Sequence, residues 1–162
     1  MDVYDDEFIA LWSTLAKYHV RYIMIGGFAV NLHKFYRTTA DIDLYIEDTS
    51  GNRVQLGIAL EELGISTREI IERMQFVPGW SMISLLSGFP LDMMTKVKGL
   101  EYMSFGQCYD LASSVEIDNI PVKFLHINHL IESKKAANRP KDQIDILALE
   151  EIKKLLEERG NA

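Results

Sequence analysis

Thr39-Ala40-Asp41-Ile42-Asp43-Leu44-Tyr45-Ile46 is the most informative segment of this 162-residue chain. From Asp41 onward, its β-branched and aromatic residues and its alternating apolar positions predict a β-strand over residues 41–46. Side chains two positions apart on a strand leave the same face, so Asp41 and Asp43 are expected to lie side by side. Neighbouring carboxylates repel each other, and a divalent cation is the usual means of offsetting that repulsion. The pair therefore predicts a metal site of the kind used in phosphoryl and nucleotidyl transfer.

A glycine pair, Gly26-Gly27, precedes this segment. It lies between an apolar strand predicted over residues 21–25 and a helix predicted over residues 28–35. Without Cβ atoms the backbone can turn sharply there, and a ligand can approach it closely. The N–H groups at the start of the following helix suit a phosphate. Strand–glycine–helix turns are common, so the pair gains its meaning from the two aspartates that follow it.

The remaining sequence predicts an α/β (α+β) fold with a mixed sheet. Early strands alternate with helices, hairpins follow, and helices close the chain. Residues 102–112 fit no single element, and residues 1–127 are expected to form a core on which C-terminal helices of residues 128–162 pack within the same domain. The other expected elements are helices over residues 5–19, 54–63, 66–75, 128–138 and 142–159 and hairpins over residues 80–97 and 114–125.

Composition narrows the classes of function. The net charge of −7 argues against a general DNA- or RNA-binding protein, although metals can supply the positive charge at a nucleotide site. Cys108 is the only cysteine, which excludes an intramolecular disulfide and favours a reducing, cytoplasmic setting. The acidic N-terminal residues do not resemble a signal peptide, and no apolar run approaches the roughly 20 residues of a membrane helix. We therefore expect a cytoplasmic protein without a membrane partner.

The glycine pair and the Asp-apolar-Asp strand together resemble the nucleotidyltransferase superfamily, which includes DNA polymerase β-like enzymes and aminoglycoside nucleotidyltransferases. A closer resemblance is to the AbiEii-type nucleotidyltransferases, the toxin partners of type IV toxin–antitoxin pairs, and their uncharacterised relatives. It covers roughly residues 20–150. Its three motifs here are Gly26-Gly27-Phe28-Ala29, Arg37-Thr38-Thr39-Ala40-Asp41-Ile42-Asp43 and Lys134 … Arg139-Pro140-Lys141-Asp142.

The resemblance implies a nucleotidyltransferase-like mixed sheet flanked by helices, in which Asp41 and Asp43 hold two Mg²⁺ (or Mn²⁺) ions. The superfamily's third carboxylate is not marked by a strong motif. Asp92 is the candidate, as a metal ligand and as a general base, because it stands among apolar residues where an unpaired charge is costly. Gly26 and Gly27 would cradle the triphosphate of an NTP through backbone N–H groups.

Arg37, Thr39 and Lys134 complete the expected nucleotide-binding residues. Arg37 or Lys134 would neutralise the charge that develops on pyrophosphate. The activity that the resemblance implies is transfer of a nucleotidyl group from an NTP to a hydroxyl of RNA, protein or a small molecule. A toxin–antitoxin or defence role goes with it.

Other interpretations compete with this one. Asp41 could cap the loop while Asp43 pairs with Arg37, and Asp92 could face solvent or form a structural ion pair. Asp142 could cap the last helix or pair with Arg139. The lysines and arginine of the third motif could lie on a solvated helix face.

The main alternative function is a non-catalytic or regulatory binding module that acts with a protein partner. It is motivated by the unmarked third carboxylate, by Lys34 after His33 where relatives often have His-Gly, and by only about 35 residues after the sheet. An acidic mimic of nucleic acid within a larger assembly ranks last, because the acids are scattered. The four histidines show no zinc spacing.

Overall fold

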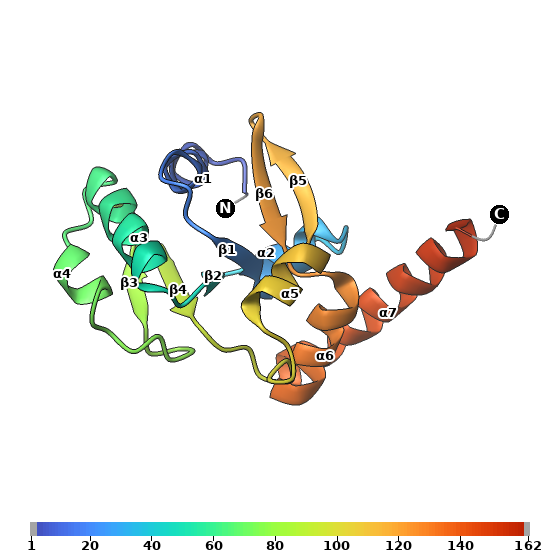
Figure 1. Cartoon of the computed structure of the whole chain (residues 1–162). Helices are drawn as coiled ribbons and strands as arrows, with labels where there is room; N and C mark the ends of the chain where they lie inside the picture. Colours follow the sequence, from blue (N-terminus) through green and yellow to red (C-terminus); the bar gives the residue numbers. More distant parts are fainter. Residues whose placement is uncertain (1–2, 161–162) are drawn as a thin grey trace.

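A six-stranded mixed β-sheet in the order β3-β4-β2-β1-β6-β5 forms the centre of the protein, whose computed structural model describes residues 3–160 (Figure 1). Helices surround the sheet, and the C-terminal end of α7 extends away from it. Within the described residues the elements are α1 (Asp6–Lys17), β1 (Tyr22–Ile25), α2 (Gly26–Leu32), β2 (Ile42–Ile46), α3 (Ser50–Glu62), α4 (Arg68–Ile71), β3 (Met82–Ser84), β4 (Pro90–Met94), α5 (Phe105–Leu111), β5 (Ser113–Ile117), β6 (Ile120–Phe124), α6 (Ile127–Ala137) and α7 (Pro140–Gly160).

The central strands set the geometry of the site. β1 pairs antiparallel with β2, and Ile25 lies opposite Asp43. β2 pairs parallel with β4, and Asp43 lies opposite Asp92. The two predicted hairpins are present as the antiparallel pairs β3–β4 and β5–β6. The sheet therefore carries the turn after β1, the start of β2 and the middle of β4 next to one another.

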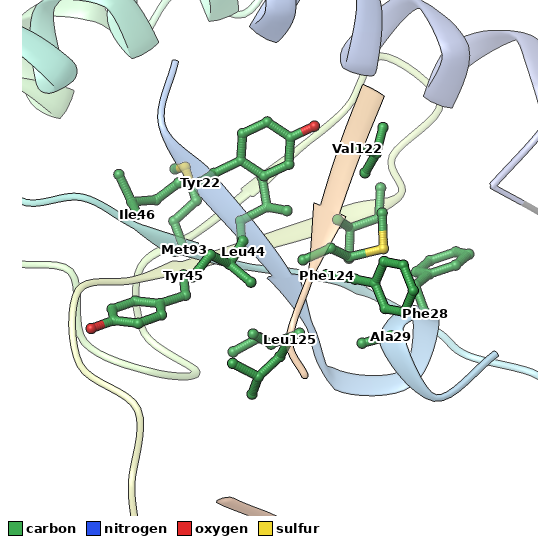
Figure 2. Packing of buried hydrophobic residues seen from close by; sticks show 14 of the residues in the cluster. Tyr22, Phe28, Ala29, Leu44, Tyr45, Ile46, Met93, Val122, Phe124 and Leu125 are labelled. Atoms are coloured by element: carbon green, nitrogen blue, oxygen red, sulfur yellow. The ribbon is translucent and has the colours of Figure 1, made fainter. Parts of the chain in front are cut away.

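Apolar side chains from several strands and from α2 pack together beneath this region (Figure 2). All four residues of β1 are buried, as expected for a strand covered on both faces. Phe28 of α2 lies edge-to-face against Phe8 of α1, with ring centroids 5.5 Å apart. Each fully buried side chain of this size contributes about 1.5–3 kcal/mol, so the core holds the strand ends in fixed positions.

Three helices begin at positions that the sequence did not indicate. α2 starts at Gly26, so the glycine pair forms its first turn instead of preceding it. α3 starts at Ser50 because the Thr49 side chain accepts a hydrogen bond from the backbone N–H of Asn52. Residues 102–112, which fitted no single element, contain α5, whose start is fixed by a capping box of Ser104 and Gln107.

The expected bounds of two further helices were wrong. The helix expected over residues 66–75 is one short turn, Arg68–Ile71. The last helix begins at Pro140 and not at Asp142, because proline at the first helical position loses no backbone hydrogen bond. The break between α6 and α7 lies at Asn138, which caps α6 in the left-handed conformation.

No helix in residues 3–160 combines the length and the apolar character needed to span a bilayer.

Candidate active site

Three carboxylates line one cavity of about 390 Å³. Asp41 immediately precedes β2, Asp43 lies on β2, and Asp92 lies on β4 directly opposite Asp43. The structure thus brings together the two aspartates of the sequence motif and the residue expected to be the third carboxylate. Other residues that line this cavity include Gly26, Gly79, Lys98, Lys134 and Arg139.

The carboxylates repel one another in a poorly solvated setting. Burial and, to a smaller extent, the negative charges of Asp41 and Asp92 together raise the pKa of Asp43 to about 6. The nearby charge of Arg139 acts in the opposite direction. Burial also raises the pKa of Asp92, with a smaller contribution from Asp41. Added positive charge would therefore stabilise this group of side chains.

Asp92 has one oxygen without a partner. Its Oδ2 accepts a hydrogen bond of 2.7 Å from the backbone N–H of Gly79. Its Oδ1 is buried and has no hydrogen-bond partner. An unsatisfied buried acceptor costs about 1–3 kcal/mol, and more when it carries charge. Such an atom at a cavity wall suits a cation or a hydroxyl proton.

The glycine pair allows side chains to lie against the backbone. Gly26 has φ +65°, and a Cβ added there would lie 1.9 Å from Oδ2 of Asp43. A Cβ added at Gly27 would lie 2.3 Å from Oγ1 of Thr39. That hydroxyl donates to the backbone carbonyl of Asp41 at 3.3 Å. The close approach expected at these glycines is therefore made by the chain's own aspartate and threonine, and the triphosphate cradle stays a prediction.

Gly26→Ala is expected to displace the Asp43 carboxylate and to weaken Mg²⁺ binding more than it weakens the fold. The left-handed backbone conformation costs an alanine about 1–3 kcal/mol, and the added methyl group occupies the position of Oδ2. Denaturant unfolding and Mg²⁺ titration measure the two effects. Gly51→Ala is the matched control, since a Cβ there meets nothing within 4 Å and stability should be unchanged or slightly raised. Unchanged Mg²⁺ binding in Gly26→Ala would contradict this account.

A buried ion cluster of five residues adjoins the cavity. Arg37 donates to both oxygens of Asp145, at 2.7 and 2.8 Å. Lys134 lies 2.8 Å from Asp145 and 3.3 Å from Asp142, and Arg139 lies 2.7 Å from Asp142. Asp142 and Asp145 are essentially inaccessible, at 0% and 1% exposure, and Lys134 is 4% exposed. The cluster ties the loop before β2 to α6 and α7.

This cluster settles several of the structural alternatives. Arg37 pairs with Asp145, so its alternative pairing with Asp43 is wrong. The pairing of Arg139 with Asp142 is confirmed. Arg139 also lines the cavity and acts on Asp43, so it does not lie on a merely solvated helix face. Lys134 lines the cavity as well, while its ammonium group is held by the acids of α7.

Sequence reasoning missed Asp145 and the residues before β3. Asp145 stands three positions after Asp142 on α7, and that spacing places two acids on one helix face. This spacing was the signal available for Asp145, although it does not show that the shared face is buried. Gly79 and Lys98 carried no motif. The pairing of β3 with β4 brings Gly79, which precedes β3, to the cavity, and Lys98 lines it from the segment after β4.

The donor set suits a hard divalent cation. Among the described residues, no group of three or more His, Cys, Asp or Glu side chains is arranged to hold a metal ion by itself. Mg²⁺ rarely uses such a cage, because it usually retains water and binds one or two carboxylates together with substrate phosphates. The oxygen donors at the cavity, the unpartnered Oδ1 of Asp92 and the raised pKa of Asp43 fit that mode of binding.

The fold is nucleotidyltransferase-like. The structure of this chain is similar to that of an antigenic nucleotidyltransferase-like protein from Paracoccidioides brasiliensis, which was determined by crystallography. The TM-score is 0.52 and the sequence identity is 19%. The match covers 88% of this chain and 74% of that chain. This likeness confirms the expected mixed sheet flanked by helices.

Residues 4–157 match the model of a family described as "Nucleotidyltransferase of unknown function (DUF6036)", and the chain belongs to that family. The resemblance to the nucleotidyltransferase superfamily is thereby confirmed, whereas the closer relation to AbiEii-type proteins stays a prediction. No curated protein matches the chain.

Proposed function

We propose that this protein is a metal-dependent nucleotidyltransferase that transfers a nucleotidyl group from an NTP to a hydroxyl acceptor. One observation carries the proposal. Asp43 and Asp92 stand opposite each other on adjacent parallel strands, with Asp41 beside them, and all three line the same cavity. Family membership supports the reaction class.

Asp41 and Asp43 would bind Mg²⁺ or Mn²⁺, with Asp92 as a third ligand. When bound, such an ion neutralises phosphate oxygens and lowers the pKa of an attacking hydroxyl. Asp92, whose Oδ1 has no hydrogen-bond partner, would take the hydroxyl proton. The hydroxyl oxygen then forms a bond to the α-phosphorus. The bond from that phosphorus to the bridging oxygen breaks, and pyrophosphate leaves.

The triphosphate would lie on the side of the glycine pair, of which Gly26 lines the cavity. Lys134 would contribute positive charge from the cavity wall, and Arg37 and Thr39 would fix the loop that carries Asp41. Arg139 would serve pyrophosphate better than Lys134 or Arg37. Its side chain is half exposed, and its charge already acts on Asp43.

Incubation with α-labelled NTPs, Mg²⁺ or Mn²⁺, and total RNA or total protein is expected to transfer label to an acceptor, and chelation by EDTA should abolish the transfer. NTP and Mg²⁺ together should also raise the midpoint of thermal unfolding, because ligands that bind only the folded state stabilise it. The absence of both label transfer and stabilisation would overturn the proposal.

A regulatory binding module is the second candidate. Arg37 and Lys134 are both paired with Asp145, which leaves fewer free cations for catalysis. Calorimetric binding of NTP without turnover on any acceptor would favour this alternative. A toxin–antitoxin or defence role follows only from the resemblance to AbiEii-type proteins. Growth arrest on expression, relieved by an adjacently encoded protein, would support it.

A further inference from the structure

The turn of residues 77–81 presents an exposed tryptophan next to the candidate active site. Pro78 and Gly79 line the cavity, and Trp80 follows them with 87% of its surface exposed. The turn is held in place, since the backbone N–H of Trp80 donates to the carbonyl of Val77 at 2.9 Å. The Ser81 hydroxyl also donates to the carbonyl of Gln75 at 2.8 Å. Trp80 is therefore a large apolar ring displayed from a fixed turn.

The order of strands places this turn opposite the glycine pair. Ile25, next to Gly26, lies opposite Asp43; Asp43 lies opposite Asp92; and Asp92 lies opposite Met82, two residues after Trp80. The row of carboxylates thus has the glycine pair on one side and the turn on the other. Gly79 also donates its backbone N–H to Asp92.

The chemistry of transfer assigns these two sides to different substrates. The attacking and leaving oxygens lie roughly in line through the reacting phosphorus. If pyrophosphate leaves on the glycine side, the acceptor hydroxyl must arrive from the opposite side. That side carries Asp92, which would take the proton, and the turn with Trp80.

An exposed tryptophan offers a flat surface on which a base can stack. Lys98, which is exposed and lines the same cavity, carries a positive charge that complements a phosphate. A ligand that has a flat ring for Trp80, a phosphate for Lys98 and a hydroxyl for Asp92 is a nucleotide. We propose that the acceptor hydroxyl belongs to a nucleotide, free or at the end of an RNA, whose base stacks on Trp80. This inference rests on the proposed function.

Tryptophan fluorescence tests the inference directly, because Trp80 is exposed whereas Trp12 is completely buried. With Mg²⁺ and tripolyphosphate present, AMP or a short single-stranded RNA is expected to quench the emission, and ribose 5-phosphate is not. Quenching by AMP indicates a free nucleotide, and quenching by RNA alone indicates an RNA end. Trp80→Phe should bind AMP without a fluorescence change, because only Trp12 then emits.

Trp80→Ala is expected to weaken binding of the quenching nucleotide by roughly 5- to 150-fold in calorimetry. Leu86→Ala, which removes another exposed apolar side chain, between β3 and β4, should leave binding unchanged. Equal affinity for AMP and ribose 5-phosphate, or unchanged binding in Trp80→Ala, would overturn the inference. Tripolyphosphate binding that is lost in Asp43→Asn supports the proposed function separately. Its absence from the unmodified protein would count against that function, and the inference would fail with it.

Discussion

Asp43→Asn should reduce nucleotidyl transfer at least about 10³-fold and at the same time make the folded protein more stable. The amide keeps the shape of the side chain but loses the charge that would hold the cation, and several kcal/mol of transition-state stabilisation go with it. The same charge is unfavourable in the ion-free protein, where burial and the charges of Asp41 and Asp92 raise the pKa of Asp43 to about 6. Relief of that cost should add up to about 3 kcal/mol to the free energy of unfolding.

The stability gain should depend on pH in a defined direction. The pKa of Asp43 rises from 3.8 to about 6 on folding, so the folded protein binds this proton more tightly than the unfolded chain. The stability that the folded protein gains from this tighter proton binding is fully present below pH 3.8. It is lost as the pH rises through about 6. The difference between Asp43→Asn and the unmodified protein should therefore grow across this interval and level off above it.

Urea unfolding between pH 4.5 and 8, with and without Mg²⁺, measures this difference. Mg²⁺ should stabilise the unmodified protein and should have little effect on Asp43→Asn. Asp118→Asn, which makes the same chemical change at an exposed turn between β5 and β6, is the control and should alter neither property. An active Asp43→Asn variant would rule out a catalytic role for this carboxylate.

Local sequence patterns were sufficient for the part of the site that lies on one strand. The alternation around Asp43 indicated both the strand and the common direction of the two aspartates, because side-chain direction has a period of two. The pairing of Asp43 with Asp92 is a contact between distant segments, and no local pattern encodes its register. Asp92 was the candidate because the resemblance implies a third carboxylate on a later strand and because an unpaired acid among apolar residues is costly.

The buried ion cluster shows where such reasoning stops. Arg37 and Asp145 lie 108 residues apart in sequence, and each is also consistent with a solvated charge. Acids on α7 stand among lysines and glutamates, where periodicity alone does not separate the buried face from the exposed one. Trp80 is a similar case, since residues 80 and 81 were expected in a strand and lie instead in the turn before β3.

Asp145→Ala should lower the free energy of unfolding by about 3–5 kcal/mol, a large share of the stability of a small protein. Asp145 is 1% exposed and accepts hydrogen bonds from Arg37. It also pairs with Lys134 at 2.8 Å. Without it Lys134, which is 4% exposed, keeps only Asp142 at 3.3 Å, and Arg37 has no carboxylate partner. The cost comes from these two poorly compensated cations.

Glu150→Ala provides the matched control for Asp145→Ala. Glu150 also lies on α7 and pairs with a lysine of α6, Lys135, but these two side chains are 45% and 56% exposed. Removal of an exposed pair should cost no more than about 1 kcal/mol. Lys134→Met, added to Asp145→Ala, should recover part of the loss because it removes a buried unpaired cation. Urea unfolding compares all three variants, and equal losses for Asp145→Ala and Glu150→Ala would contradict the account.

The dependence of the free energy of unfolding on pH in the acidic range gives an independent check on the role of Asp145. Burial alone would raise the pKa of its carboxyl, but hydrogen bonds from Arg37 and Lys134 outweigh burial and hold the pKa below its ordinary value of 3.8. A group with a lowered pKa contributes stability that is present above its unfolded value and is lost as the pH falls through its folded value. Asp145→Ala should therefore lose less stability than the unmodified protein as the pH falls below about 4. Because Arg37 lies in the loop that also carries Asp41, the same variant should also weaken Mg²⁺ binding, whereas Glu150→Ala should not.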